Sequence, residues 1–442
     1  MPPRSSPPTQ LLVRPRRLIR VAVDVCIVAG LAFWILDLLL VRGSWGVIEP
    51  LRHLFDLEHE TGLPRWFFVS QMLMISLTSW LIYAVGRSRR SKIVVWFVLA
   101  VFFSLLTVTL GARLLSRLTD VDLAVAHLLA MAGGTVLWFL LLRHAAGLGS
   151  DYRVTVDDER HAGPDPATED PSGLVRIRLS SGRIIRRVVV TAVLLELGLV
   201  LLDYHVTLRG LEAPGFLRSL FNMAREDSLP NWIGATQTTL AAGTLWLVLF
   251  VVRARTSRRW LRWGWLALAV FFTYMAVDDG ASLHENFGLL LEQLAGRFDE
   301  SGGRLLRLFP SYPWHLLFVP LFAAAGLFAA VFLVRQSSRA KARVLVLASL
   351  ALLGLAVGLD FLEGLDRQHP WNPHSRLVAA FDLEESSERL FRKSPHFIVR
   401  HVAKTFEEFL EMLANTLLWS VFLGHLLEVG SDLRIRVGDP RH

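Results

Sequence analysis

Cysteine is nearly missing from this 442-residue sequence, and two familiar catalytic patterns are missing altogether. Cys26 is the only cysteine, so neither an intrachain disulfide nor a cysteine-rich metal site is possible. The H-E-x-x-H motif of zinc proteases and the E-x-x-H pair of ferritin-like di-iron proteins do not occur. Charged residues are scarce too, at 19%. These absences leave oxygen and imidazole groups as the metal-binding chemistry that the chain can offer.

Long apolar segments dominate the chain instead. Hydrophobic residues make up 53% of it and the mean hydropathy is +0.43, far above the values of a soluble protein. Crossing about 30 Å of hydrocarbon takes about 20 residues of helix. Segments that suffice lie near residues 20–41, 66–86, 93–112, 122–144, 188–206, 231–252, 260–283, 314–334, 344–364 and 402–424. We therefore predict an all-α polytopic membrane protein with about ten transmembrane helices.

The basic residues predict which side of the membrane each loop faces. They gather in both tails and in the loops after the second, fourth, sixth and eighth spans. Because cytoplasmic loops hold an excess of Lys and Arg, we expect both termini in the cytoplasm. The net charge of +8 then follows from topology, so the expected partners are the lipid bilayer and anionic lipids at the cytoplasmic face, with no nucleic acid. Arg greatly outnumbers Lys, as in GC-rich bacteria, so we expect a multi-pass protein of the cell (inner) membrane.

The sequence contains itself twice. A shift of 166 residues matches Trp66 to Trp232 and Gln71 to Gln237 without a gap, and a shift of 281 matches residues 135–138 and 144–153 to the C-terminal part. We predict two parallel repeats joined by a linker. The predicted parts are a disordered basic tail (1–19), a first repeat of four helices (20–158), a cytoplasmic linker (159–185) and a second repeat of six helices (186–439) with an inserted pair at about 287–398. Alternating residues at 153–156, 175–179 and 434–437 favour a small cytoplasmic β element.

Only the second repeat carries clustered acids in its membrane helices. The seventh span ends A-V-D-D-G-A-S-L-H-E, whereas its counterpart in the first repeat reads T-V-T-L-G-A-R-L-L-S. A continuous helix would place Asp278, Ser282 and Glu285 on one face. The fifth span adds Glu196, where the first repeat has Gly30. The shared scaffold therefore did not need these acids, which makes them candidates for function.

The ninth and tenth spans bring further acids to the same outer end. One unpaired charge inside a membrane costs about 3 kcal/mol, so protonation, a salt bridge or a bound cation must compensate for the set. Carboxylates with imidazole suit Zn, Mn or Fe, and a metal-bound water is a nucleophile for hydrolysis. The candidate catalytic residues are Asp279, Glu285 and Glu408. The candidate metal ligands are Asp278, Asp279, His284, Glu285, Asp360, Glu363, His401, Glu408 and Glu411.

Three functions are compatible with these acids. The first is a divalent-metal-dependent membrane enzyme, hydrolase-like, that acts on a lipid or lipid-linked substrate. The second is a proton- or cation-coupled transporter or channel, because intramembrane carboxylates often bind protons and ions. The third is a non-catalytic scaffold, in which Lys404 neutralises Glu407 and Glu408 within one helical turn. Acids of the seventh, ninth and tenth spans that meet in one place favour the first function, since a shared ion needs ligands from all of them.

Overall fold

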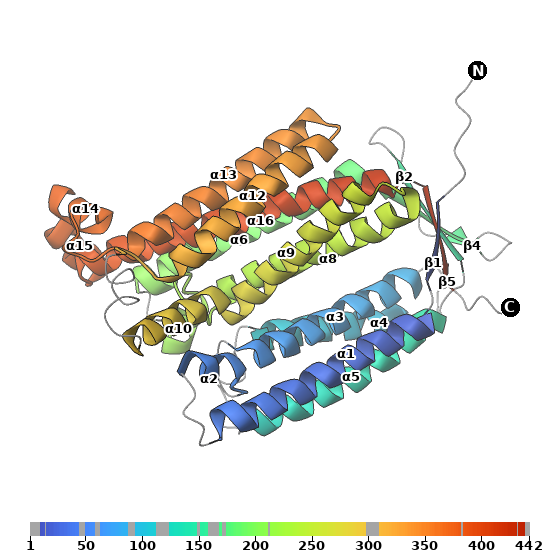
Figure 1. Cartoon of the computed structure of the whole chain (residues 1–442), viewed down its shortest axis with the longest axis horizontal. Coiled ribbons are helices and arrows are strands. Elements are labelled where there is room, and N and C mark those ends of the chain that lie inside the picture. Colours follow the sequence, from blue (N-terminus) through green and yellow to red (C-terminus); the bar gives the residue numbers. More distant parts are fainter. Residues whose placement is uncertain are drawn as a thin grey trace.

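The structure is a computed structural model that describes residues 9–13, 15–43, 49–57, 62–86, 93–111, 123–147, 151–157, 168–169, 174–210, 213–297, 309–381, 383–430 and 432–437. Within these ranges, long helices run side by side and a small sheet covers one end of them (Figure 1). Both chain termini lie at that end, which we call the sheet end. The opposite end, which we call the far end, carries α2 (Glu49–Phe55), α10 (Leu283–Arg297), α14 (Pro373–Phe381) and α15 (Leu383–Phe391).

The long helices occupy the ten ranges that the apolar segments predict. They are α1 (Pro15–Leu36), α3 (Leu63–Gly86), α4 (Ile93–Gly111), α5 (Leu123–Gly147), α6 (Ser181–Leu202), α8 (Leu229–Arg255), α9 (Arg259–Ala281), α12 (Trp314–Gln336), α13 (Ala340–Glu363) and α16 (Pro395–Val429). Among the described residues, seven helices are long and apolar enough to cross a membrane, namely α1, α3, α8, α9, α12, α13 and α16. They indicate a multi-pass membrane protein, and a total of ten spans stays a prediction.

Local sequence fixes several helix boundaries. The Ser228 hydroxyl accepts the backbone N–H of Asn231 at 3.4 Å at the start of α8, and Pro230 lies in the first turn. Ser394 and Pro395 begin α16 in the same manner. A serine cap followed by proline suits a helix start, because the serine pairs a free N–H and the proline has none to pair. α1 and α6 continue into the π-helices η1 (Asp37–Val41) and η3 (Asp203–Leu208), and the short α7 (Gly215–Leu220) follows.

The sheet joins strands from distant parts of the chain. Its order is β1-β5-β2-β4-β3, with parallel pairing of β1 to β5 and of β2 to β4. The strands are β1 (Thr9–Val13), β2 (Asp151–Asp157), β3 (Thr168–Glu169), β4 (Leu174–Ser180) and β5 (Asp432–Val437). They include the three alternating segments. Part of the tail that its composition predicts to be disordered is therefore a strand, because its T-Q-L-L-V stretch pairs with β5.

The helices form two groups that meet along α3, α4, α8 and α9 (Figure 1). One group holds α1, α3, α4 and α5, and its buried core includes Ile75 and Ile82. The other holds α6, α8, α9, α12, α13 and α16, around a core with Leu245, Trp265 and Phe422. Contact between the groups is reciprocal: α3 touches α9, and α4 touches α8.

Positions that match in sequence make matching contacts in the two groups. Three contacts of the first group have counterparts at the shifted positions of the second, with the same atoms or ring faces. The pairs are Trp138 Nε1 to Thr78 Oγ1 (3.2 Å) with Trp419 Nε1 to Thr244 Oγ1 (3.0 Å), Gln71 Nε2 to Thr135 Oγ1 (3.2 Å) with Gln237 Nε2 to Thr416 Oγ1 (3.2 Å), and the stacked rings of Trp96 and His144 with those of Trp265 and His425.

Candidate functional site

Lys404 lies at the centre of an acidic cluster at the far end. Its Nζ is 2.7 Å from Glu407 Oε1, 3.5 Å from Glu408 Oε1 and 3.5 Å from Asp360 Oδ1. Lys404 and both glutamates lie in the first half of α16, nearer the far end, whereas Asp360 lies near the end of α13, which packs along α16. One ammonium group therefore faces three carboxyl groups.

Three carboxylates of this cluster are close enough to share an ion. Oxygen atoms of Asp360, Glu363 and Glu407 lie within 4.8 Å of one another. Arg400 donates from Nε and Nη2 to Glu363 Oε1, at 3.0 and 2.9 Å, which fixes that carboxylate while its other oxygen stays available. Among the described residues, Glu363 Oε2 and Asp360 Oδ2 are buried without a hydrogen-bond partner.

His315 of α12 points a second kind of ligand atom at the same place. Its Nδ1–H donates to the carbonyl oxygen of Tyr312 at 3.1 Å, so the neutral ring presents a lone pair at Nε2. That Nε2 is 3.3 Å from Asp360 Oδ2, and neither atom has a hydrogen-bond partner in the described part of the chain. His315 is only 4% exposed. Two lone pairs that face each other in a buried place need a proton or a metal ion between them.

A break in the seventh predicted span positions a second group of polar residues. α9 ends at Ala281, because Ser282 has a φ of 47° and a left-handed conformation, and α10 begins at Leu283. Asp278 Oδ1 accepts the backbone N–H of His284 at 2.8 Å, and its Oδ2 accepts the His284 ring Nδ1–H at 2.8 Å. The expectation of one continuous helical face through Asp278, Ser282 and Glu285 is therefore wrong. The kink instead turns His284 back onto Asp278.

Two carboxylates of the far end share a proton. Ser282 Oγ donates to Glu226 Oε2 at 2.6 Å, and a hydrogen bond joins the side chains of Glu226 and Glu285. Loss of water and the neighbouring Glu226 carboxylate raise the pKa of Glu285 well above its ordinary value. Although loss of water opposes it, the hydrogen bonds from Glu285 and Ser282 lower the pKa of Glu226. At neutral pH, Glu226 is thus the charged member of the pair and Glu285 is the protonated one.

Comparison with known families matches the part of the chain that holds this site. Residues 187–426 match the model of a domain of unknown function, DUF8692. The chain belongs to this family. The match starts close to the predicted start of the second repeat, whereas the first repeat lies outside it. It contains Lys404 and all the acids described above at the far end. No curated protein and no solved structure matches the chain.

Most of the predicted site residues lie together within the DUF8692 domain. Asp360 and Glu363 belong to the three-carboxylate group, and Glu408 contacts the same lysine. The charges of Asp279, Glu408 and Glu411 act on one another, and those of His284 and Glu285 act on Asp360. The acids of the seventh predicted span thus influence those of the ninth and tenth spans through their charges. Among the described residues, however, only Asp360, Glu363 and Glu407 come close enough to share an ion, so the expectation of ligands from all three spans is not met.

His401 is the predicted ligand that the structure does not bring into this group. Its Nε2–H donates to Asp203 of η3 at 2.9 Å, and the Thr405 hydroxyl and the Met223 N–H donate to the same carboxylate, at 2.8 and 3.3 Å. In the first repeat, Asp37 accepts the N–H of Leu57 at 3.1 Å, at the matching positions. His401 thus completes a scaffold contact that both halves of the chain share.

Sequence reasoning missed Glu407, His315 and Glu226 as parts of the site. Glu407 directly precedes Glu408 in the helix but is the one that is grouped with Asp360. Residue spacing alone does not say which of two adjacent acids points toward a neighbouring helix. His315 lies at the start of the predicted span 314–334, directly after a loop, where a histidine is expected to be exposed to solvent. One signal could have marked it: His315, Asp360 and Glu363 all lie in the inserted helix pair, which has no counterpart in the first repeat.

Proposed function

We propose that this protein is a divalent-metal-dependent membrane enzyme, hydrolase-like, that acts on a lipid or lipid-linked substrate. The observation that carries the proposal is the meeting of Asp360, Glu363 and Glu407 within 4.8 Å, with the buried and unpaired Nε2 of His315 beside Asp360. A histidine whose Nδ1–H is tied to a carbonyl presents its other nitrogen in the orientation that metal ligands use. Oxygen and imidazole donors together suit Zn, Mn or Fe.

Lys404 and Arg400 would hold the ligands in place while the ion is absent. Each carboxylate at the site has a cation within 3.5 Å, which offsets the repulsion among the acids. A bound ion would supply a water molecule of lowered pKa. Glu408, which contacts Lys404 but is not one of the three grouped carboxylates, is then the residue placed to accept the proton of that water.

Metal analysis of the detergent-purified protein tests the proposal. After incubation with Zn, Mn or Fe and thorough washing, the wild type should keep about one ion per chain. Glu407→Gln and Asp360→Asn should lose it, because each removes a ligand charge. Asp366→Asn is the matched control, since Asp366 lies in the same connection after α13 but outside the three-carboxylate group. A wild type that keeps no ion, or a control that also loses it, would refute the proposal.

A second candidate, proton- or cation-coupled transport, is favoured by Glu196. This residue lies well inside α6 and is completely buried, and its Oε1 accepts from Gln237 Nε2 at 2.8 Å and from Thr416 Oγ1 at 2.6 Å. Its Oε2 has no partner among the described residues. Proton flux into liposomes that is unchanged by Glu196→Gln would contradict this candidate, whereas flux that Glu196→Gln abolishes would favour it over hydrolysis.

We also infer that the chain is an internal duplication with both termini in the cytoplasm of a bacterial cell. The matching contacts of Trp138 and Trp419 support the duplication, as does the reciprocal contact between the two groups of helices. The sheet supports the orientation, because it joins both termini at the end where the predicted basic loops gather. Anionic lipid headgroups are the expected partners of those loops. Cysteine labelling of Ser338→Cys from either side of sealed vesicles tests the orientation.

A further inference from the structure

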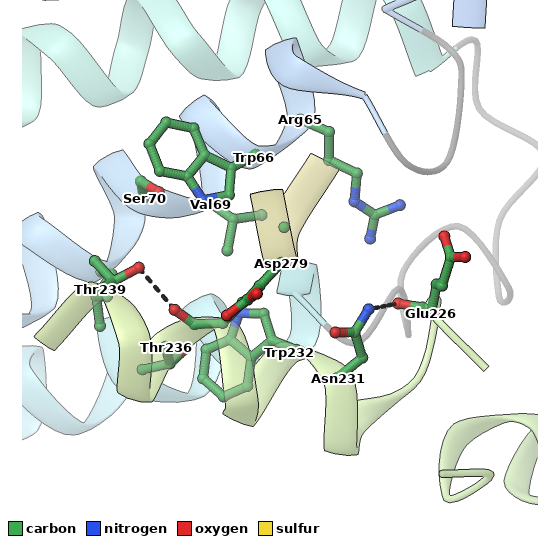
Figure 2. A pocket seen from close by; sticks show the side chains of 13 residues that line it. Arg65, Trp66, Val69, Ser70, Glu226, Asn231, Trp232, Thr236, Thr239 and Asp279 are labelled. Atoms are coloured by element: carbon green, nitrogen blue, oxygen red, sulfur yellow. Dashed lines mark hydrogen bonds between the residues drawn. The ribbon is translucent and has the colours of Figure 1, made fainter. Parts of the chain in front are cut away.

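A pocket lies between the two groups of helices, and none of the three grouped carboxylates lines it. It spans about 560 Å³, part of it open to the surroundings, and its main walls are α3 and α8 (Figure 2). Five residues of α3 and five of α8 line it, and each α8 residue is the counterpart of one on α3 after the shift of 166. Trp66 thus faces the same space as Trp232, and Ser70 the same space as Thr236. The pocket therefore lies on the axis that relates the two repeats.

The charges around the pocket do not follow that symmetry. Arg65 of α3 has the neutral Asn231 as its counterpart on α8. Asp279 and Glu226 add two acids from the second repeat, and Asp279 stands where the first repeat has Leu110. Figure 2 shows Asp279 between Trp66 and Trp232 in this view, with Arg65 and Glu226 to the right of these three residues. The pocket thus presents one cation and two anions beside two aromatic rings.

Neighbouring contacts hold these groups in place. Arg65 Nη2 donates to the carbonyl oxygen of Leu110 at 2.9 Å, and the Thr238 hydroxyl donates to Asp279 Oδ2 at 2.7 Å. Trp66 packs directly on Gly280, where an added Cβ would lie 1.9 Å from the indole ring. The absence of a side chain at Gly280 lets the indole approach the end of α9. The charged groups and the aromatic wall are therefore built before any ligand arrives.

The depth of the pocket fits a lipid. Arg65 and Trp66 lie in the first turn of α3 and Trp232 in the first turn of α8, at the helix ends where tryptophan lies at the level of lipid headgroups. Farther along the same helices no charged residue lines the pocket, and Val69, Leu73 and Ala235 alternate with small hydroxyl residues. The hydroxyl of Thr239 donates within its own helix, to the carbonyl oxygen of Ala235 at 2.7 Å. A ligand with a charged head and an apolar tail would meet matching surfaces in that order.

We propose that this pocket binds a glycerophospholipid with a primary-amine headgroup, with its phosphate at Arg65, its ammonium group at Asp279 and Glu226, and an acyl chain between α3 and α8. Arginine pairs with phosphate through directed hydrogen bonds, and ammonium groups are attracted both to carboxylates and to indole faces. An anionic lipid without the amine would leave Asp279 and Glu226 facing its negative charge. A zwitterionic lipid brings a charge of the opposite sign to each of these three groups.

This inference deepens the proposed function and rests on it in one respect, the role of the bound lipid as substrate. The pocket adjoins the acidic cluster, since Glu226 belongs to both and Asp279 acts on Glu408. Lipid binding itself does not require the metal. A Glu407→Gln variant that loses its ion but keeps its lipid preference would therefore separate the two proposals.

Lipid binding to the full-length protein in mild detergent tests the pocket. Native mass spectrometry would compare phosphatidylethanolamine with phosphatidylglycerol of the same acyl chains. We expect at least about tenfold tighter binding of phosphatidylethanolamine, and loss of about tenfold in affinity in Asp279→Asn and in Arg65→Gln, because each removes one charged contact. Trp232→Leu should weaken binding as well, whereas Trp371→Leu, at a 73% exposed position outside the pocket, should not.

Several outcomes would overturn the proposal. Equal binding of the two lipids by the wild type would show an unselective contact with the bilayer, and this comparison needs no variant to fold. Tighter binding of phosphatidylglycerol that depends on Arg65 would assign the pocket to an anionic lipid. Equally tight binding of water-soluble phosphoethanolamine would assign it to a free headgroup compound. Unchanged preference in folded Asp279→Asn would remove the ammonium contact on which the proposal depends.

Discussion

The two repeats share a scaffold and differ in what they place on it. In the first repeat, Met72 lies against Gly134, where an added Cβ would meet the methionine methyl group at 2.6 Å. In the second repeat the same two positions are Thr238 and Asn415, joined by a hydrogen bond of 3.2 Å. Thr238 then donates to Asp279. An apolar contact in one copy has thus become a polar chain that holds an acid in the other.

A similar exchange surrounds the glutamine that both repeats keep. Gln71 and Gln237 each donate to a threonine of the last helix of their repeat. In the second repeat Glu196 joins this pair, whereas Gly30 stands at the matching position of the first. The duplicated contacts stabilise the bundle, and the added acids use positions that the bundle does not need. Removing an added group and removing a shared one should therefore have different consequences.

The largest effect is expected at Lys404, whose ammonium group faces three carboxyl groups of the second repeat. Lys404→Met leaves Asp360, Glu407 and Glu408 without their common partner, and an uncompensated buried charge costs about 3 kcal/mol. The melting temperature of the purified protein should fall strongly, and Lys404→Arg should keep most of it. The first repeat has Leu123 at this place, and Ala126 and His127 where the second repeat has Glu407 and Glu408. An unchanged melting temperature in Lys404→Met would mean that the acids are already neutral.

A smaller loss is expected where the two repeats touch. Gly280→Ala places a Cβ 1.9 Å from Cδ1 of Trp66, so either the indole or α9 must move, at a cost of about 1–3 kcal/mol. Gly243→Ala is the control, because no atom lies within 4 Å of its added Cβ and alanine favours a helix. Thermal unfolding followed by circular dichroism would measure both. Equal behaviour of the two variants would contradict the close contact between the repeats.

Equal losses are expected from a shared contact in the two copies. Thr78→Val and Thr244→Val each remove the acceptor of a partly buried tryptophan N–H, at 3.2 and 3.0 Å, and should each cost about 1 kcal/mol. Thr109→Val is the control, since its exposed hydroxyl donates only within its own helix. A loss confined to Thr244→Val would show that the copies no longer depend on the same contacts.

The helices were predictable from the sequence, and the directions of their side chains were not. Apolar length alone located the ten long helices that the described residues form, because the bilayer sets that length. The kink at Ser282 escaped the prediction, since a left-handed serine leaves no mark in helical periodicity. Glu408 was chosen as a candidate in place of Glu407, because which of the two side chains points at Asp360 depends on how α13 packs on α16. Histidine is a common metal ligand, which made His401 a candidate. Its partner Asp203 is a scaffold residue, because Asp37 makes the matching contact in the first repeat.

The smallest effect on stability is expected at Glu196, although no acid in the described part of the chain is more deeply buried. Glu196→Gln keeps an oxygen that can accept from Gln237 and Thr416, so the substitution should change the free energy of unfolding by less than about 1 kcal/mol. The first repeat is the precedent, because Gln71 bonds Thr135 there without any acid. Urea or thermal unfolding of the variant beside the wild type measures the change. A loss as large as that of Lys404→Met would place Glu196 in the shared scaffold, and the comparison between the repeats would then no longer separate fold from function.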